Sequence, residues 1–251
     1  MIIFDKDTKF ENMINNVVCG DCGEVMKIIP DNSINLIFTS PPYNQGLTTQ
    51  DKAMSLYEDN LSESDYFKMI HDVFFNAKRI LKDNASMYYN YKSNVNKNIL
   101  DPAFKHLLKA NELAQFYIVG EIVWNYAGDF DSTMTRWHVD YEMIYHLAKS
   151  KNFKFIYNKR QLSSIWNIKH VMGGTFEKKT CSSHPCPFPK HIVIKALEHS
   201  TNKDDIVVDP FGGSGTVALS CKELGRKFIS IEIDKNYCEI QDRRLAQSQL
   251  F

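Results

Sequence analysis

The stretch of sequence that decides the fold is DDIVVDPFGGSGT, residues 204–216. Its β-branched run, 206–209, is long enough for a buried strand, and the glycines that follow predict a tight turn. Residues 217–224 then predict a helix with Gly225 as its C-terminal cap, and residues 227–232 predict a second strand that ends on Glu232. The order is strand, glycine turn, helix, strand, acid, which is typical of nucleotide-binding α/β proteins.

The chemistry of this turn narrows the ligand. Glycines let the backbone approach a ligand closely, and an acid at the tip of the next strand can accept hydrogen bonds from ribose hydroxyls. Here another acid, Asp209, precedes the glycines. Its charge would repel a pyrophosphate but would suit an aminoacyl ammonium group. The turn therefore favours S-adenosyl-L-methionine over a dinucleotide, with a ligand-free strand-to-helix turn as the alternative.

The N-terminal part of the chain has a matching pattern. Residues 16–19 and 33–38 predict strands, separated by Gly20-Asp21 and a short helix over 24–29. The second strand leads into TSPPYN, residues 39–44. Two consecutive prolines cannot continue a central strand, because they fix φ and donate no hydrogen bonds. Ser40–Asn44 must therefore form a rigid loop at the carboxyl end of a strand, where open α/β sheets bind ligands.

The middle of the chain predicts further helices and strands. The apolar spacing indicates a helix over 62–81 and a strand over 87–91, and Asp101-Pro102 would begin a helix as N-cap and first-turn proline. Residues 116–124 and 141–147 predict two strands, for which an antiparallel pairing is one option, and residues 189–199 predict a helix. Residues 45–61 are aperiodic and predict a long loop beside the Ser-Pro-Pro-Tyr turn.

Composition limits the class of protein. The chain has 251 residues, of which 43% are hydrophobic and 24% charged, as in a soluble globular domain. No apolar run reaches the roughly 18 residues of a membrane span, and the start of the sequence lacks a signal-peptide pattern. Six cysteines without an export signal predict reduced thiols. We therefore expect a cytoplasmic protein.

Charge is unevenly distributed. Thirty basic and thirty acidic residues cancel, but residues 149–195 hold ten Lys or Arg against one acid, Glu177. Aromatic residues are interleaved with these charges at Phe153, Phe155 and Trp166. The segment is either a solvated lysine face or a nucleic-acid surface, and the aromatic residues make the second at least as well supported.

With both motifs in view, the sequence resembles the amino-group DNA methyltransferases, which methylate the exocyclic N4 of cytosine or N6 of adenine. Residues 39–44 resemble the family's catalytic motif and residues 209–216 its cofactor motif. The catalytic motif comes first, which is the circularly permuted order of the beta group. The resemblance covers nearly the whole chain. It implies a single catalytic domain over 1–251 with an α/β, Rossmann-like methyltransferase fold: a mixed seven-stranded sheet with helices on both faces.

The resemblance also carries roles over to particular residues. The catalytic motif corresponds to Ser40, Pro41, Pro42 and Tyr43. Asp21 would contact the adenine of S-adenosyl-L-methionine, Glu232 its ribose, and residues 184–189 its methionine end. The full set expected to bind the cofactor is Asp21, Cys22, Ser40, Phe188, Pro189, Asp209, Phe211, Gly212, Gly213, Ser214, Gly215, Thr216, Glu232 and Ile233.

A short target-recognition region is implied at about 156–183, and residues 45–61 would form a mobile loop that also contacts DNA. The side chains expected to bind DNA are Asn44, Lys159, Arg160, Lys169, His170, Lys178 and Lys179. The partners implied are double-stranded DNA, a second copy of the chain in a homodimer, and a cognate restriction endonuclease, with no membrane.

The residues suggest a direct transfer. An exocyclic amino nitrogen is a poor nucleophile, and acceptors aimed at its hydrogens would localise its lone pair. The Ser40 hydroxyl oxygen and the Pro41 carbonyl are the expected acceptors. Tyr43 would stack on a base extruded from the duplex. Neither a covalent intermediate nor a dedicated histidine base is needed.

Several alternatives remain. Ser40 resembles the N4-cytosine enzymes, whereas Asp or Asn is usual at this position for N6-adenine, so cytosine is favoured and adenine stays open. An RNA or protein-glutamine substrate, or a non-catalytic binding module, is more remote. Two half-motifs are weaker still: a zinc site formed by Cys19 and Cys22 with Cys181, His184 and Cys186, and a carbon-5 nucleophile at Pro185-Cys186. We expect no metal.

Overall fold

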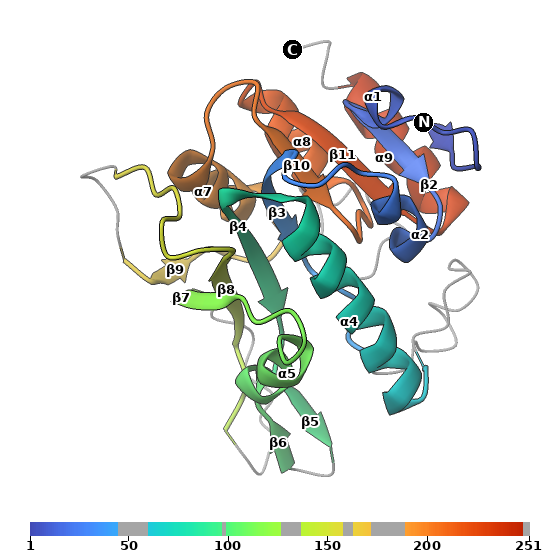
Figure 1. The fold of residues 1–251 in the computed structure, drawn as a ribbon. Coiled ribbons are helices and arrows are strands. Elements are labelled where there is room, and N and C mark those ends of the chain that lie inside the picture. Colours follow the sequence, from blue (N-terminus) through green and yellow to red (C-terminus); the bar gives the residue numbers. More distant parts are fainter. Residues whose placement is uncertain (45–59, 97–98, 127–136, 158–162, 172–188, 248–251) are drawn as a thin grey trace.

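The computed structural model describes residues 1–44, 60–96, 99–126, 137–157, 163–171 and 189–247. These residues form one large sheet with helices on both faces (Figure 1). The strands lie in the order β1-β2-β11-β10-β3-β4-β8-β7-β9. Their bounds, in that order, are Ile2–Ile3, Asn16–Cys19, Lys227–Glu232, Ile206–Asp209, Ile34–Thr39, Leu81–Tyr91, Tyr141–Ala148, Tyr117–Asn125 and Ile165–Asn167.

Strand directions divide the sheet into two parts. From β1 to β4 all neighbours are parallel, whereas β8 is antiparallel to both β4 and β7, and β9 runs parallel to β7. A separate hairpin of β5 (Asn94–Asn96) and β6 (Ile99–Asp101) projects at the bottom of Figure 1. The mixed sheet and the antiparallel pairing of β7 with β8 confirm the predictions.

The described sheet has nine strands, whereas seven were expected. The two additional strands are the edge strands β1 and β9, which are two and three residues long. Each pairs with a single neighbour, and neither is long enough to show a period of two. Their pairing is therefore set by the neighbouring strand and leaves little signal in the sequence.

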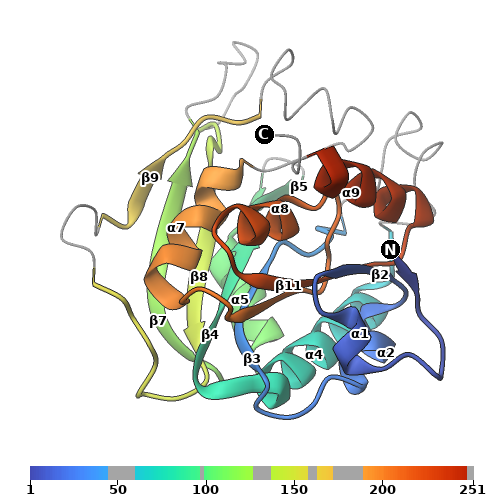
Figure 2. The same cartoon turned by 90° about the horizontal axis from the view of Figure 1, so that it is seen from above.

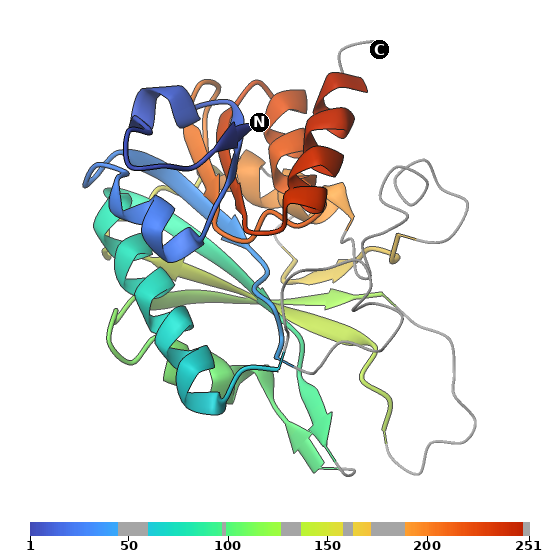
Figure 3. The same cartoon turned by 90° about the vertical axis from the view of Figure 1, so that its right-hand side faces the viewer.

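The helices cover the two faces separately (Figures 2 and 3). On one face lie α1 (Phe10–Met13), α2 (Cys22–Lys27), α4 (Glu63–Ile80) and α5 (Ala103–Ala110), and on the other lie α7 (Lys190–Ser200), α8 (Thr216–Glu223) and α9 (Lys235–Gln247). None of the described helices is long and apolar enough to cross a bilayer.

The central strands are buried on both faces, which is why their sequences read as continuous apolar runs. Ile37 and Val208 are paired neighbours that face the α4 side, and Leu36 and Val207 are paired neighbours that face the α7 side. All four are fully buried. The alternation of β3 and β10 thus sends side chains into two hydrophobic cores.

Most of the predicted element boundaries hold to within a residue or two, and two need correction. The Asp101-Pro102 pair does not begin a helix at the aspartate, because Asp101 closes the β5–β6 hairpin and α5 begins at Ala103 with Pro102 as N-cap. Leu81 begins β4 rather than ending α4, so β4 extends over 81–91 instead of 87–91.

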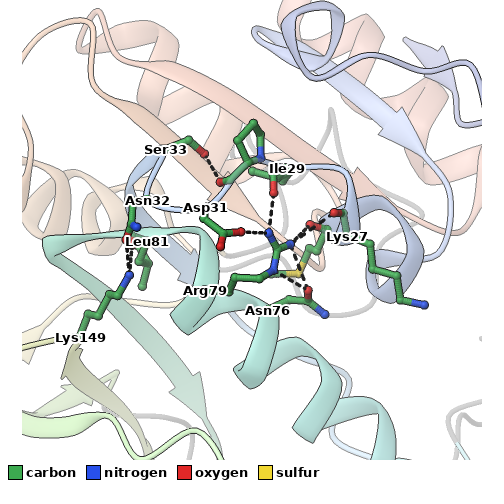
Figure 4. Close-up of polar contacts among 11 residues, drawn as sticks. Lys27, Ile29, Asp31, Asn32, Ser33, Asn76, Arg79, Leu81 and Lys149 are labelled. Carbon is green, nitrogen blue, oxygen red and sulfur yellow. Dashed lines mark hydrogen bonds and ion pairs between the residues drawn. The ribbon is translucent and has the colours of Figure 1, made fainter.

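One polar cluster fixes the end of the sheet opposite the motifs (Figure 4). The Arg79 guanidinium, from the last turn of α4, donates to the carbonyls of Met26 (2.8 Å) and Ile29 (2.9 Å) and pairs with Asp31. It thereby binds the backbone carbonyls where α2 ends and connects α4 to that end. Lys149 donates to the Leu81 carbonyl (2.6 Å) beside it. The amino ends of β3 and β4 are held in place by these two cations.

Candidate active site

Parallel strands bring both sequence motifs to one edge of the sheet. The carboxyl ends of β3 and β10 are neighbours there, so Thr39, at the start of the Ser-Pro-Pro-Tyr loop, meets Asp209, at the start of the glycine turn. The Thr39 hydroxyl donates to Asp209 Oδ1 at 2.8 Å, across 170 residues of sequence. The predicted catalytic loop and the predicted cofactor turn are therefore directly connected.

Asp209 is a buried carboxylate at this junction. It is 2% exposed, and its Oδ1 accepts hydrogen bonds from Thr39 and from the Phe211 backbone N–H at 3.1 Å. Burial raises the pKa of Asp209 to about 7, and the two hydrogen bonds oppose that rise. A buried carboxylate is costly unless a cation or enough donors meet it. This position consequently suits the positively charged end of a ligand.

Two glycines of the turn are required by backbone conformation. Gly213 and Gly215 have φ of 50° and 83°, in the left-handed region.

Gly212 is required because neighbouring side chains of this protein leave no room for a Cβ, and not because a ligand approaches closely. A Cβ at Gly212 would collide with Ser230 Oγ and with Gln241 Nε2. The Ser230 hydroxyl donates to Gln241 Oε1 at 2.7 Å, and Gln241 Nε2 donates to the Gly213 carbonyl at 3.1 Å. Arg244 supports the turn in the same way by donating to the Ser214 carbonyl. Ser230, Gln241 and Arg244 thus hold the turn in shape, although no motif marks them.

Glu232 connects the turn to the next helix. Its Oε2 accepts the Gly213 N–H and its Oε1 accepts the Asp234 N–H, both at 2.8 Å. Burial raises the pKa of Glu232 to about 7, and the backbone hydrogen bonds oppose the rise. Ile233 follows it and is 50% exposed. The acid is therefore at the strand tip where the sequence predicts it, already engaged with the backbone.

The Gly20-Asp21 turn lies next to this acid. The Gly20 N–H donates to the Glu232 carbonyl at 2.9 Å. Asp21 is exposed and caps α2, because its Oδ1 accepts the Glu24 N–H at 3.0 Å. Cys22 faces the core, where burial raises the pKa of its thiol. Asp21 thus borders the predicted cofactor site, whereas the Cys22 side chain points into the core.

The catalytic loop is held from two sides. Pro41 is buried, and the Pro42 carbonyl accepts the Tyr66 hydroxyl of α4 at 2.9 Å. The Tyr43 ring packs edge-on against Tyr91 of β4, with ring centroids 5.0 Å apart. These contacts anchor the double-proline loop to α4 and β4.

Two half-buried side chains of this loop, Ser40 and Tyr43, contact the buried side chains of Asn90 and Glu142, and we call these four residues the loop cluster. Ser40 Oγ lies 3.1 Å from the Tyr43 hydroxyl, which donates to Glu142 Oε2 at 3.1 Å. Asn90 Nδ2 donates to the same carboxylate oxygen at 2.8 Å and also lies 3.2 Å from the Tyr43 hydroxyl. Glu142 is 7% exposed, and burial raises its pKa.

Asn90 and Glu142 were not predicted from the sequence. The signal available was one polar residue among apolar and aromatic ones in part of each strand: Asn90 in MYYNY (residues 87–91) of β4 and Glu142 in YEMIY (residues 141–145) of β8. That signal does not say that the two side chains meet, because it depends on the antiparallel register between these strands. Asn90 Oδ1 is buried and has no hydrogen-bond partner among the described residues. This buried acceptor lies in the same side chain whose Nδ2 contacts Ser40, Tyr43 and Glu142.

Part of the predicted DNA surface has other partners. Lys149 binds the Leu81 carbonyl, Lys154 pairs with Asp205 at 3.0 Å, and Lys190 pairs with Glu223 at 2.9 Å. These three lysines of the basic segment contribute to the fold. Lys169 is exposed. His170 packs on the Tyr126 ring, with centroids 3.8 Å apart.

The remaining predicted site residues include one DNA contact and one cofactor contact that the structure describes, and others that it does not describe. Asn44 donates its amide to the Leu61 carbonyl at 2.9 Å and so connects the two sides of segment 45–59. Pro189 is buried at the start of α7. The residues that lie outside the described ranges are Lys159, Arg160, Lys178, Lys179 and Phe188, most of segments 45–61 and 156–183, and the half-motif residues Cys181, His184, Pro185 and Cys186. Within the described ranges, no group of three or more metal-ligating side chains could hold an ion.

Comparison with known proteins agrees with this arrangement. Type II methyltransferase M2.MboI of Moraxella bovis is 29% identical over 247 residues, which cover 91% of this chain and 86% of that protein. DNA adenine methyltransferase YhdJ of Escherichia coli is 28% identical, covering 95% and 85%.

Among solved structures, PvuII DNA methyltransferase (cytosine-N4-specific) superposes with a TM-score of 0.76 at 21% identity, covering 91% of this chain and 85% of that chain. The M1.HpyAVI–SAM complex gives 0.68 at 23% identity, covering 92% and 98%. These similarities show that the methyltransferase fold is shared. The sequence profile of the DNA methylase family for N6 and N4 methylation matches residues 34–243. Because that match spans well over half of the sequence, this chain belongs to the N6/N4 DNA methylase family.

Proposed function

We propose that this protein transfers a methyl group from S-adenosyl-L-methionine to the exocyclic N4 of a cytosine extruded from double-stranded DNA. The observation that carries the proposal is the Thr39–Asp209 hydrogen bond, because it joins the predicted catalytic loop to the predicted cofactor turn. Family membership and the fold shared with a cytosine-N4-specific methyltransferase support it. The M1.HpyAVI complex supports the choice of cofactor.

The described residues fit this cofactor. The buried carboxylate of Asp209 would meet its ammonium group, which relieves the cost of burying an uncompensated charge. Glu232 has lone pairs left for ribose hydroxyls, since each of its oxygens accepts one backbone N–H. Asp21, on the same edge, would contact the adenine. Phe211, Ile233 and Pro189 would line the site.

Catalysis would be a matter of position and electrostatics. The cofactor supplies an electrophilic methyl group on a sulfonium sulfur. Ser40 Oγ and the Pro41 carbonyl would accept the two hydrogens of the target amino group, which makes its lone pair available for in-line attack. Transfer would form the nitrogen–carbon bond and break the sulfur–carbon bond, and the surplus amino proton would leave to solvent. Tyr43, held by Tyr91, would stack on the extruded base.

Adenine is the second candidate for the target base. Ser40 favours cytosine, whereas the similarity to DNA adenine methyltransferase YhdJ favours adenine N6. We further propose that the enzyme works within a restriction-modification system, beside a cognate endonuclease and as a homodimer. The Type II methyltransferase relatives support the first of these associations.

The test is direct. The protein is incubated with methyl-labelled S-adenosyl-L-methionine and unmethylated genomic DNA, the DNA is digested to nucleosides, and the labelled nucleoside is identified by chromatography. Label on N4-methylcytosine supports the proposal, and label on N6-methyladenine supports the second candidate. Cofactor binding by calorimetry without any label in DNA would contradict both and would favour an RNA or protein substrate. The Ser40→Ala variant, which should lose activity but keep cofactor binding, is the matched control.

A further inference from the structure

We propose that Glu142 is a positioning residue that acts through Tyr43 to orient the Ser40 hydroxyl as an acceptor toward the target amino group. This role rests on the function proposed above. It assigns the donor and the acceptor of each hydrogen bond in the loop cluster. The members of the cluster come from three parts of the chain, namely the catalytic loop that follows β3, strand β4 and strand β8.

These assignments follow from what each group can donate. An ionised carboxylate only accepts hydrogen bonds, so the Tyr43 hydroxyl, 3.1 Å from Glu142 Oε2, must point its proton at that oxygen. The Tyr43 oxygen is then left to accept, and the Ser40 hydroxyl 3.1 Å away donates to it. Ser40 Oγ then has one lone pair toward Asn90 Nδ2, which donates to it at 3.4 Å, and one lone pair left for the amino group of an approaching base.

Asn90 reinforces this order. Its Nδ2 donates to Glu142 Oε2 at 2.8 Å, which fixes the orientation of the amide. The same amide faces the Tyr43 oxygen at 3.2 Å. Two donors therefore converge on one carboxylate oxygen, and the tyrosine cannot turn its proton toward Ser40 without losing this bond.

The arrangement accounts for how a serine could serve in the catalytic motif. A neutral hydroxyl is a weaker acceptor than a carboxylate, but hydrogen bonds in a chain polarise one another, and those that end on a charge are strengthened most. Here the negative charge lies two hydrogen bonds behind Ser40. Glu142 would supply from β8 the charge that the motif itself lacks.

A purely structural role for Glu142 is less well supported. The β4–β8 pairing already has a continuous backbone ladder, with Asn90 opposite Ile144 and Tyr91 opposite Met143. Glu142 is buried, and its charge is not needed for that ladder. The groups that affect its ionisation are Asn90 and Tyr43 in the cluster and the cation of Lys92 just beyond β4.

The experiment is a double-mutant cycle on the single-turnover rate of methyl transfer to DNA. Glu142→Gln keeps the volume and can still accept from Tyr43 through its amide oxygen, so it removes only the charge. Losing a charge-assisted bond is expected to slow the step about 10-fold. Tyr43→Phe removes the connecting hydroxyl but keeps the ring. In the Tyr43→Phe background, Glu142→Gln should therefore have no further effect.

The controls separate this role from general damage. Glu121 is an exposed carboxylate on the adjacent strand β7, and Glu121→Gln should leave the rate unchanged. Cofactor affinity measured by calorimetry should be the same in all variants. A full rate in Glu142→Gln, or an equal loss in both backgrounds, would overturn the positioning role. Wild-type protein that labels no base in DNA would instead overturn the proposed function, and this role with it.

Discussion

Replacing Asp209 with Asn should stabilise the folded protein and weaken cofactor binding. Burial raises the pKa of this carboxyl from its ordinary value of 3.8 to about 7. Ionised Asp209 therefore destabilises the folded state, and the penalty grows as the pH rises from about 4 to about 7 and is constant above that range. Full ionisation corresponds to about 4 kcal/mol. Asn removes the charge and can still accept from the Thr39 hydroxyl and the Phe211 N–H.

The sign of the pH dependence makes the test specific. The free energy of unfolding is measured by urea titration without cofactor. It should be higher for Asp209→Asn than for the wild type by about 4 kcal/mol at pH 8.5 and by about 2 kcal/mol at pH 5.5. Affinity for S-adenosyl-L-methionine at pH 8 should fall about 100-fold, because the ammonium loses its counter-charge.

The matched control is Asp204→Asn, at an exposed position with φ of 65° that asparagine tolerates. It should change neither quantity. A variant less stable than wild type at pH 8.5, or one that binds the cofactor as tightly, would refute the assignment of Asp209 as a buried counter-charge.

Three further outcomes are expected. Gly212→Ala should lower the free energy of unfolding by about 2–4 kcal/mol in urea titrations, because its methyl group displaces Gln241 from the turn; a loss below 0.5 kcal/mol would contradict this packing. Tyr66→Phe removes the bond to the Pro42 carbonyl, so kcat should fall several-fold in steady-state assays while calorimetric cofactor affinity stays constant. Lys169→Ala should weaken DNA binding and reduce the slope of log K against log salt by about 1 in fluorescence titrations, and an unchanged slope would remove Lys169 from the DNA surface.

The local patterns of the sequence predict the central part of the fold. β10, the glycine turn, α8 and β11 form a contiguous unit whose buried strands and left-handed glycines each leave a signal in the sequence. The sequence also predicts that both motifs lie at one edge of the sheet, because the carboxyl ends of parallel strands lie at the same edge. The rest depends on contacts between distant residues. The register of β4 with β8 brings Asn90 to Glu142, and Gln241 imposes the need for Gly212 from 29 residues further along.

Charge counting misleads for a similar reason. Lys149 and Lys154 look the same in sequence as Lys169, but the first two bind a backbone carbonyl and a carboxylate of this chain. Only the fold separates lysines that stabilise it from lysines left for a polyanion.

The hydrogen bond from Asn44 to the Leu61 carbonyl has a consequence for engineering. It closes the chain between two fixed points, one at the end of the catalytic loop and the other just before α4. The cost of closing a loop between fixed ends grows slowly, by about 0.6 kcal/mol for each doubling of its length. The sequence predicts that residues 45–59 contact DNA, so exchanging them for a segment of another length or sequence should change DNA specificity while Ser40 and Tyr43 keep their geometry.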